Sequence, residues 1–133
     1  IDLFMGYKGL GFNIVVNRLA EMYGVANFTT KPKVVAKFEY KNEDGKTLYI
    51  KERVEPGREG KDKEFFFKHQ KNGKWVNGRG CDPVLYNLPG AVGNKVLIFV
   101  EGEGKARLLA NWGLPATCLD SGAKSQWKDE YFK

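Results

Sequence analysis

The hydrophobic positions change period once along the chain, and this change separates a helical part from a β-rich part. From Phe12 to Tyr23, apolar residues recur every three or four positions, which is the spacing of an amphipathic helix. Gly24 follows where a helix stop is expected. Residues 1–7 indicate the end of an earlier helix, and residues 29–33 form a polar linker. We therefore expect a helical N-terminal preface over residues 1–28.

After the linker, apolar and polar residues alternate with a period of two. Residues 34–54 alternate on both sides of the turn-forming segment Asn42–Gly45, which predicts an antiparallel β-hairpin. A shorter second hairpin is predicted where the strands Phe65–Phe67 and Trp75–Val76 flank the turn Asn72–Gly73. We expect the three phenylalanines to belong to the core. The middle of the chain, residues 33–94, is thus predicted to be rich in β-hairpins.

The last part of the chain has the pattern of a parallel β-α-β unit. Val96–Val100 is a continuous apolar run, as is typical of a strand that is covered on both faces. The acidic turn Glu101–Gly104 follows, then a helical pattern over 105–112 and a second apolar strand over 116–119. The fold class is predicted as α+β, with a partial parallel α/β unit over residues 95–133.

Composition and charge narrow the class of protein. Of the 133 residues, 42% are hydrophobic and 14% aromatic, so a packed core is expected and disorder is not. The net charge of +6 favours an anionic partner, although many basic proteins are simply soluble. Cys81 and Cys118 lie far apart in the sequence, and His69 is the single histidine, so the usual ligand spacings of a zinc site are missing. We expect no zinc site, and two reduced and mostly buried thiols in a cytoplasmic protein. No apolar run is long enough to span a membrane, and no signal peptide opens the chain.

Three stretches, in this order, resemble one family. They are Ile1–Met5 with Gly9–Phe12 and Arg18–Val25; the middle segment with Tyr40, Glu43–Gly45, Arg53, Phe65–Lys68, Trp75, Gly80 and Val84–Pro89; and Val100–Glu103 with Leu108–Leu109 and Gly113–Thr117. Together they are similar to DNA primases of the bacterial type found in phages and plasmids. The resemblance runs from the end of the zinc-ribbon domain, through the region before TOPRIM, into the first half of the TOPRIM domain.

The resemblance implies a parent protein that makes RNA primers on single-stranded DNA by metal-dependent nucleotidyl transfer during DNA replication. Its partners would be the template and nucleotides, and its cofactor Mg²⁺ or Mn²⁺. The zinc-ribbon cysteines would precede Ile1, and the paired aspartates of the second TOPRIM motif would follow Lys133. Lys105 and Arg107 also stand where the family carries acidic residues. Because Ile1 is not an initiator methionine, we expect a fragment. Since metal-dependent phosphoryl transfer needs several carboxylates on each ion, we expect this fragment to be inactive alone and to hold no ordered metal ion.

Glu101 is the candidate catalytic residue. A carboxylate at the C-terminal end of a parallel strand points towards the crevice where α/β sheets bind ligands. The resemblance implies that Glu101 is the TOPRIM glutamate, acting as acid/base or metal-site residue, whereas the plain alternative is a solvated glutamate. Glu103 could assist, or could serve only as a helix N-terminal carboxylate. Gly102 and Gly104 permit a tight turn with backbone N–H groups open to a phosphate.

Basic residues around an aromatic ring predict a track for single-stranded nucleic acid. Cations neutralise phosphates and an aromatic face stacks with bases. The predicted track comprises Arg53, Lys68, Lys71, Lys74, Trp75 and Arg79. The alternative is a basic turn that only keeps the domain soluble.

Two other functions remain open from the sequence. One is a non-catalytic module that binds single-stranded nucleic acid, and the other is a different TOPRIM enzyme such as a topoisomerase or nuclease. Because the TOPRIM sheet looks cut short, we also expect self-association through an exposed strand edge.

Overall fold

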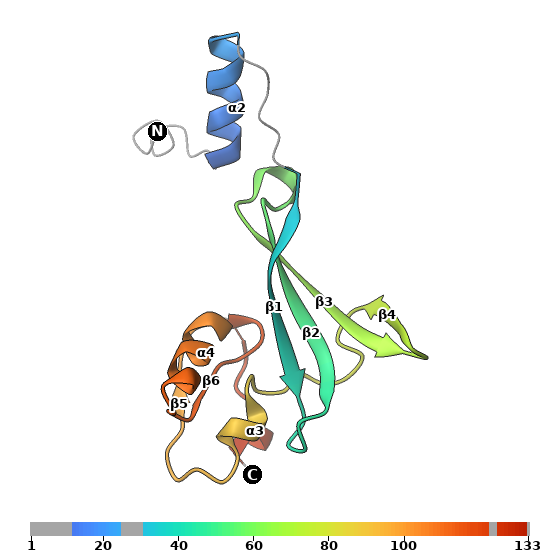
Figure 1. The fold of residues 1–133 in the computed structure, drawn as a ribbon, viewed down its shortest axis with the longest axis vertical. Helices are drawn as coiled ribbons and strands as arrows, with labels where there is room; N and C mark the ends of the chain where they lie inside the picture. The colour runs from blue at the N-terminus through green and yellow to red at the C-terminus, as the bar shows by residue number, and fades with distance from the viewer. Residues whose placement is uncertain (1–11, 25–30, 123–124, 133) are drawn as a thin grey trace. The chain divides into compact units, whose positions relative to one another are not determined.

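The computed structural model describes residues 12–24, 31–122 and 125–132, and these form an α+β protein. Four strands form one sheet in the order β1-β2-β3-β4, and two short strands form a second, parallel sheet (Figure 1). The predicted mixed class is therefore confirmed, while the TOPRIM assignment stays a prediction. The chain divides into two compact units, one of residues 1–37 and 52–66 and the other of residues 38–51 and 67–133.

The larger sheet is built from two hairpins. Its strands are β1 (Lys33–Lys41), β2 (Thr47–Glu55), β3 (Glu64–Lys71) and β4 (Lys74–Asn77). At the predicted first turn, the backbone N–H of Lys46 donates to the Asn42 side chain at 2.8 Å. The second turn has positive φ at both central residues, 51° at Asn72 and 73° at Gly73. This is the conformation that a two-residue hairpin loop requires, and Asn-Gly adopts it readily. Both predicted hairpins are confirmed.

Within the described residues of the first unit, an α-helix lies beside a short 3₁₀ helix. Helix α2 (Phe12–Met22) packs against η1 (Arg58–Gly60), and Val15 is fully buried. Gly24 ends the helical segment with a φ of 65°, which confirms the predicted stop. The predicted earlier helix over residues 1–7 lies outside the described residues, as do residues 29 and 30 of the linker.

The second unit contains the parallel pair. Its elements are α3 (Leu88–Ala91), β5 (Ile98–Phe99), α4 (Glu103–Asn111), β6 (Ala116–Thr117) and η3 (Asp129–Phe132). Ile98 pairs with Ala116 and Phe99 with Thr117 in parallel register, and α4 connects the two strands. The predicted β-α-β unit is confirmed. Its strands are shorter than the apolar runs suggested, and α4 begins two residues earlier than expected.

Stacked tyrosines from the first hairpin form the core of this unit. The rings of Tyr40 and Tyr49 lie 4.7 Å apart and nearly parallel, at 11°. Tyr86 contacts Tyr40 edge to face, and its carbonyl accepts a 2.6 Å hydrogen bond from the Thr117 hydroxyl. Cys118 is fully buried beside them, and burial raises the pKa of its thiol to about 12. Cys81 is exposed, so the expectation of two buried thiols was wrong for that residue.

The compact units do not follow the predicted boundary near residue 95. Residues 38–51 and 67–94 belong to the same unit as the parallel pair. Division into functional domains at 1–28, 33–94 and 95–133 stays a prediction. No helix among the described residues has the length and apolar character needed to cross a membrane.

Candidate functional site

Glu101 lies just beyond the carboxyl end of β5, where the sequence placed it. Its side chain is 73% exposed and forms a loose ion pair with Lys105, one helical turn further on, at 3.9 Å between Nζ and Oε2. Because β5 and β6 are parallel, their carboxyl ends meet at the same edge. In open α/β sheets this edge is where ligands bind. Glu101 therefore has the position of a ligand-facing carboxylate.

A hollow of about 270 Å³ opens beside Glu101. Its lining comes from the ends of both strands and from the segment that follows β6. The lining residues are Phe99, Val100, Glu101, Leu119, Gly122 and Trp127. The indole of Trp127 meets the ring of Phe99 at 4.9 Å and 64°, and it remains 57% exposed. The hollow thus combines one carboxylate with an aromatic wall.

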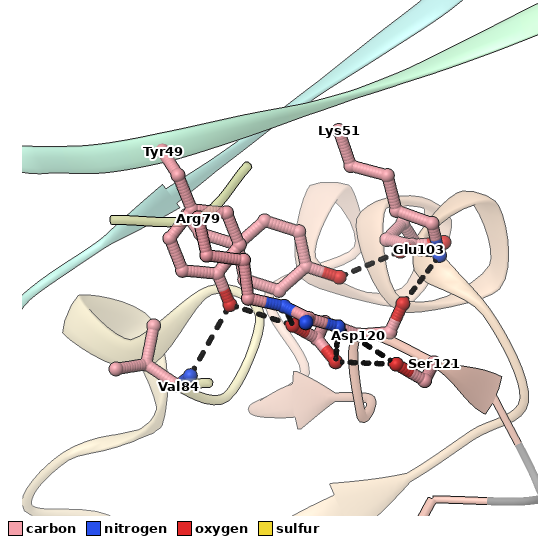
Figure 2. Close-up of polar contacts among 8 residues, drawn as sticks. Tyr49, Lys51, Arg79, Val84, Glu103, Asp120 and Ser121 are labelled. Atoms are coloured by element: carbon pink, nitrogen blue, oxygen red, sulfur yellow. Dashed lines mark hydrogen bonds and ion pairs between the residues drawn. The ribbon is translucent and has the colours of Figure 1, made fainter. Parts of the chain in front are cut away.

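Glu103, two residues further on, has the opposite environment. It is the first residue of α4 and only 5% exposed. Its Oε1 accepts hydrogen bonds from the Tyr40 hydroxyl and from Lys51 Nζ, each at 2.6 Å. Figure 2 shows Lys51 reaching Glu103 from the strand above the helix. Glu103 thus stands at the N-terminus of α4, where a carboxylate is favoured, and is held by two buried donors. Its assistance to Glu101 stays a prediction.

Asp120 anchors the other half of the same network. Lys51 donates to the Asp120 carbonyl oxygen at 2.6 Å, and the Tyr49 hydroxyl donates to Asp120 Oδ2 at 2.9 Å. Arg79 donates to both carboxylate oxygens of Asp120, from Nε to Oδ2 at 2.5 Å and from Nη2 to Oδ1 at 3.1 Å (Figure 2). The Ser121 hydroxyl completes the group, 2.9 Å from Asp120 Oδ1. Two cations and two carboxylates therefore balance each other inside the unit.

The electrostatics of this network are those of a structural clamp. Burial, and then the adjacent Glu103 carboxylate, raise the pKa of Tyr40 well above its usual range. Burial likewise raises the pKa of Tyr49, and the Asp120 carboxylate adds to this. Both phenols therefore stay protonated and keep donating. We call the residues Tyr40, Tyr49, Lys51, Arg79, Glu103 and Asp120 the buried clamp.

The carboxylates present do not by themselves fit a magnesium site. Mg²⁺ in nucleotide-processing sites is bound through carboxylates and substrate phosphates in near-octahedral geometry. Glu103 is held by Lys51 and Tyr40, which leaves Glu101 as the accessible carboxylate of the acidic turn. In the described parts of the chain, no three His, Cys, Asp or Glu side chains gather where they could hold a metal ion.

The glycines of the acidic turn allow its backbone conformation and leave open space beside it. Gly102 has a φ of 85°, which an L-residue with a side chain rarely adopts. A Cβ added at Gly102 or Gly104 would meet no atom within 4 Å. The approach to the start of α4 is therefore open at both positions.

Four residues of the predicted nucleic-acid track lie on the β3–β4 hairpin, and they are divided between its two faces. In the β3–β4 register, Lys71 pairs with Lys74 and Gln70 with Trp75. Cross-strand partners share a face and successive residues alternate. Lys71 and Lys74 therefore lie on one face, whereas Trp75, 49% exposed, lies on the other. Lys68 is on the same face as Trp75, opposite Asn77.

The two arginines of the predicted track have partners of their own. Arg53 lies in the first unit, where its Nε donates to Glu55 at 2.6 Å. Arg79 is the clamp's guanidinium and also stacks over the Phe67 ring at 4.1 Å. The structure thus brings Lys68, Lys71, Lys74 and Trp75 together on one hairpin, while both arginines are engaged in ion pairs.

Sequence reasoning missed Lys51 and Asp120. Lys51 sits in the run Lys-Glu-Arg, which resembles a solvated charged face, yet it is 6% exposed. The available signal was weak: a lysine inside an apolar alternation, at a position that must face the core.

A larger hollow of about 640 Å³, lined by residues such as Leu85, Leu88 and Tyr131, contains none of the predicted site residues.

Comparison with protein-family models, with curated proteins and with solved structures finds no match to this chain. The primase resemblance therefore depends on its own motifs alone.

Proposed function

We propose that this chain is part of a primase-type nucleotidyltransferase that makes RNA primers on single-stranded DNA, with Glu101 as its functional carboxylate. One observation carries the proposal. Glu101 follows the first strand of a parallel β-α-β unit, and its exposed side chain lines a hollow at the carboxyl edge of that unit. A ligand-facing carboxylate at such an edge is what metal-assisted phosphoryl chemistry uses.

The proposal assigns the rest of the catalytic centre to a longer parent protein. Further carboxylates would have to join Glu101 before Mg²⁺ or Mn²⁺ is held, because Glu103 is engaged in the buried clamp. When bound, the metal would stabilise negative charge on the reacting phosphate. The role of the chain itself is to hold Glu101 at the strand ends and to keep the turn before α4 open.

The test is a primer-synthesis assay with magnesium or manganese on a single-stranded template. It compares this chain with the longer parent protein and with its Glu101→Gln and Glu21→Gln variants. Glu21 is an exposed carboxylate on α2 and serves as the matched control. We expect the parent and Glu21→Gln to make primers, Glu101→Gln to lose roughly 100-fold or more in rate, and the isolated chain to make none. Full activity of Glu101→Gln would reject Glu101, and primers from the isolated chain would reject the need for further carboxylates.

A second function, binding of single-stranded nucleic acid without catalysis, is favoured by the β3–β4 hairpin. Lys71 and Lys74 are exposed and stand directly opposite each other in the ladder. Like charges in this position destabilise a sheet, so an anionic partner would relieve a repulsion that the fold leaves in place. Trp75 adds an exposed ring on the other face.

This second function is tested by replacing Lys68, Lys71 and Lys74 together with alanine. Binding to a single-stranded oligonucleotide should weaken, and its dependence on salt should fall by about one unit of slope for each lost phosphate contact. Unchanged affinity would leave these lysines with a role in solubility alone.

A further inference from the structure

We infer that the hollow beside Glu101 is a subsite for a nucleobase, with Trp127 as its stacking surface. The choice of a nucleotide as ligand rests on the proposed function, whereas the subsite itself is argued from the geometry of the hollow.

The aromatic wall has the form that stacking requires. Trp127 touches Phe99 at 64°, close to edge to face, and more than half of its surface stays accessible to solvent. Large exposed aromatic side chains that line a concave site provide flat apolar area, and bases stack on such rings regardless of sequence. Leu119 and Val100 supply the remaining apolar lining.

The size of the hollow limits what enters. At about 270 Å³ it is smaller than the roughly 300–1,000 Å³ of sites that enclose drug-sized ligands. A single ring system therefore fits better than a whole nucleotide. The sugar and the phosphates would lie at the rim, at the carboxyl ends of the two strands.

Glu101 places a negative charge at the rim of the subsite. Its carboxylate lines the same hollow, so the phosphates of a bound nucleotide meet a negative charge at the rim. Lys105, 3.9 Å away, offsets part of that repulsion. In the absence of a divalent cation, a nucleoside should bind more tightly than its monophosphate. Removing the Glu101 charge should raise the affinity for the monophosphate, relative to that for the nucleoside, roughly threefold.

The experiment uses the protein's own tryptophan as the reporter. The chain has three tryptophans, so the double variant W75F/W112F leaves Trp127 as the sole indole. This variant is titrated, without divalent cations, with adenosine, adenosine monophosphate and a single-stranded oligonucleotide, and quenching of fluorescence is recorded. Quenching by the nucleoside identifies a free nucleotide as the source of the base. Quenching by the oligonucleotide alone identifies a strand, and either result supports the subsite.

Affinities measured by equilibrium dialysis then test whether Trp127 is the stacking surface. Trp127→Ala should weaken nucleoside binding on the order of tenfold, and Trp127→Phe should restore part of it. Trp112→Ala is the matched control, because Trp112 is 67% exposed and does not line the hollow. Thermal melting of each variant shows that it is folded, and Trp127→Phe keeps the test usable if the alanine variant does not fold.

Two results would overturn the inference. One is the absence of quenching by any of the three ligands, and the other is equal nucleoside affinity in folded Trp127→Phe, Trp127→Ala and Trp112→Ala. Neither result affects the primer-synthesis assay on Glu101→Gln, so failure of the subsite and failure of the proposed function remain distinguishable.

Discussion

The buried clamp and the tip of the β3–β4 hairpin both gather charged side chains, but they arrange them in opposite ways. In the clamp, Lys51 and Arg79 each meet a carboxylate inside the unit. At the tip, Lys71 and Lys74 stand opposite each other in the ladder, and among the described residues neither has an ion-pair partner. A charge that is matched within the fold supports the fold, whereas an unmatched one leaves attraction available for a partner. The number of charges in a sequence does not separate these cases.

The clamp should depend most strongly on Lys51. Replacing Lys51 by Met leaves Glu103 buried with one donor, and breaking a buried ion pair on one side costs about 3–5 kcal/mol of unfolding free energy. Urea unfolding measures this loss. The matched control is Lys105→Met, because the exposed i,i+4 pair of Lys105 with Glu101 is worth less than about 0.5 kcal/mol. Equal effects of the two substitutions would show that the clamp is no more than a surface pair.

Tyr40 should have a smaller effect, and this effect should diminish at alkaline pH. Tyr40→Phe removes a hydrogen bond to a carboxylate, which costs about 1.5–3 kcal/mol. The pKa of Tyr40 is raised in the folded protein, so its stabilising effect is complete below the ordinary value of 10.0 and is lost as pH rises above it. Unfolding free energies between pH 8 and 11 should therefore fall less steeply for Tyr40→Phe than for the wild type. Tyr23, 77% exposed, gives the control variant Tyr23→Phe, which should behave as the wild type does.

The hairpin tip should matter least to stability. Replacing Lys71 and Lys74 by alanine removes a cross-strand repulsion, so the unfolding free energy should change by less than about 0.5 kcal/mol, in the stabilising direction. The same double variant should reduce the salt slope of oligonucleotide binding by up to about two units. The exposed lysines 31 and 33 of the first unit provide a matched double-alanine control. A large loss of stability in the double variant of Lys71 and Lys74 would show that the tip supports the fold as the clamp does.

The elements that the sequence predicted well are those whose signals are local. The turn Asn72–Gly73 carries its own conformational preference, and the apolar run before Glu101 marks a strand end without any knowledge of the rest of the chain. Strand β3 extends further than predicted, because the polar residues 68–71 follow the backbone ladder without an apolar alternation to reveal it.

What the sequence could not reveal are the partners of the charged groups. Glu103 and Lys51 are separated by 52 positions, and only the folded chain brings them to 2.6 Å. Arg79 looked like one more cation of the basic hairpin. It pairs instead with Asp120, 41 positions further along the chain, and it lies between Gly78 and Gly80, which have positive φ values of 98° and 72°. Spacing shows which charges are neighbours along the chain and not which ones neutralise each other.

Gly80 also links the substitutions that positions 69 and 80 can accept. A Cβ at position 80 would lie less than 3.0 Å from three atoms of the His69 ring, which is held by a 2.9 Å contact between its Nδ1 and the carbonyl oxygen of Gly78. A side chain at position 80 therefore requires that the His69 ring moves, with loss of its contact to Gly78, or that His69 is replaced by a smaller residue. Even then the positive φ favours Asn or Asp over other residues. In a mutational pathway, a smaller residue at position 69 should therefore ease a later change at position 80, and its reversal would bring the steric conflict back.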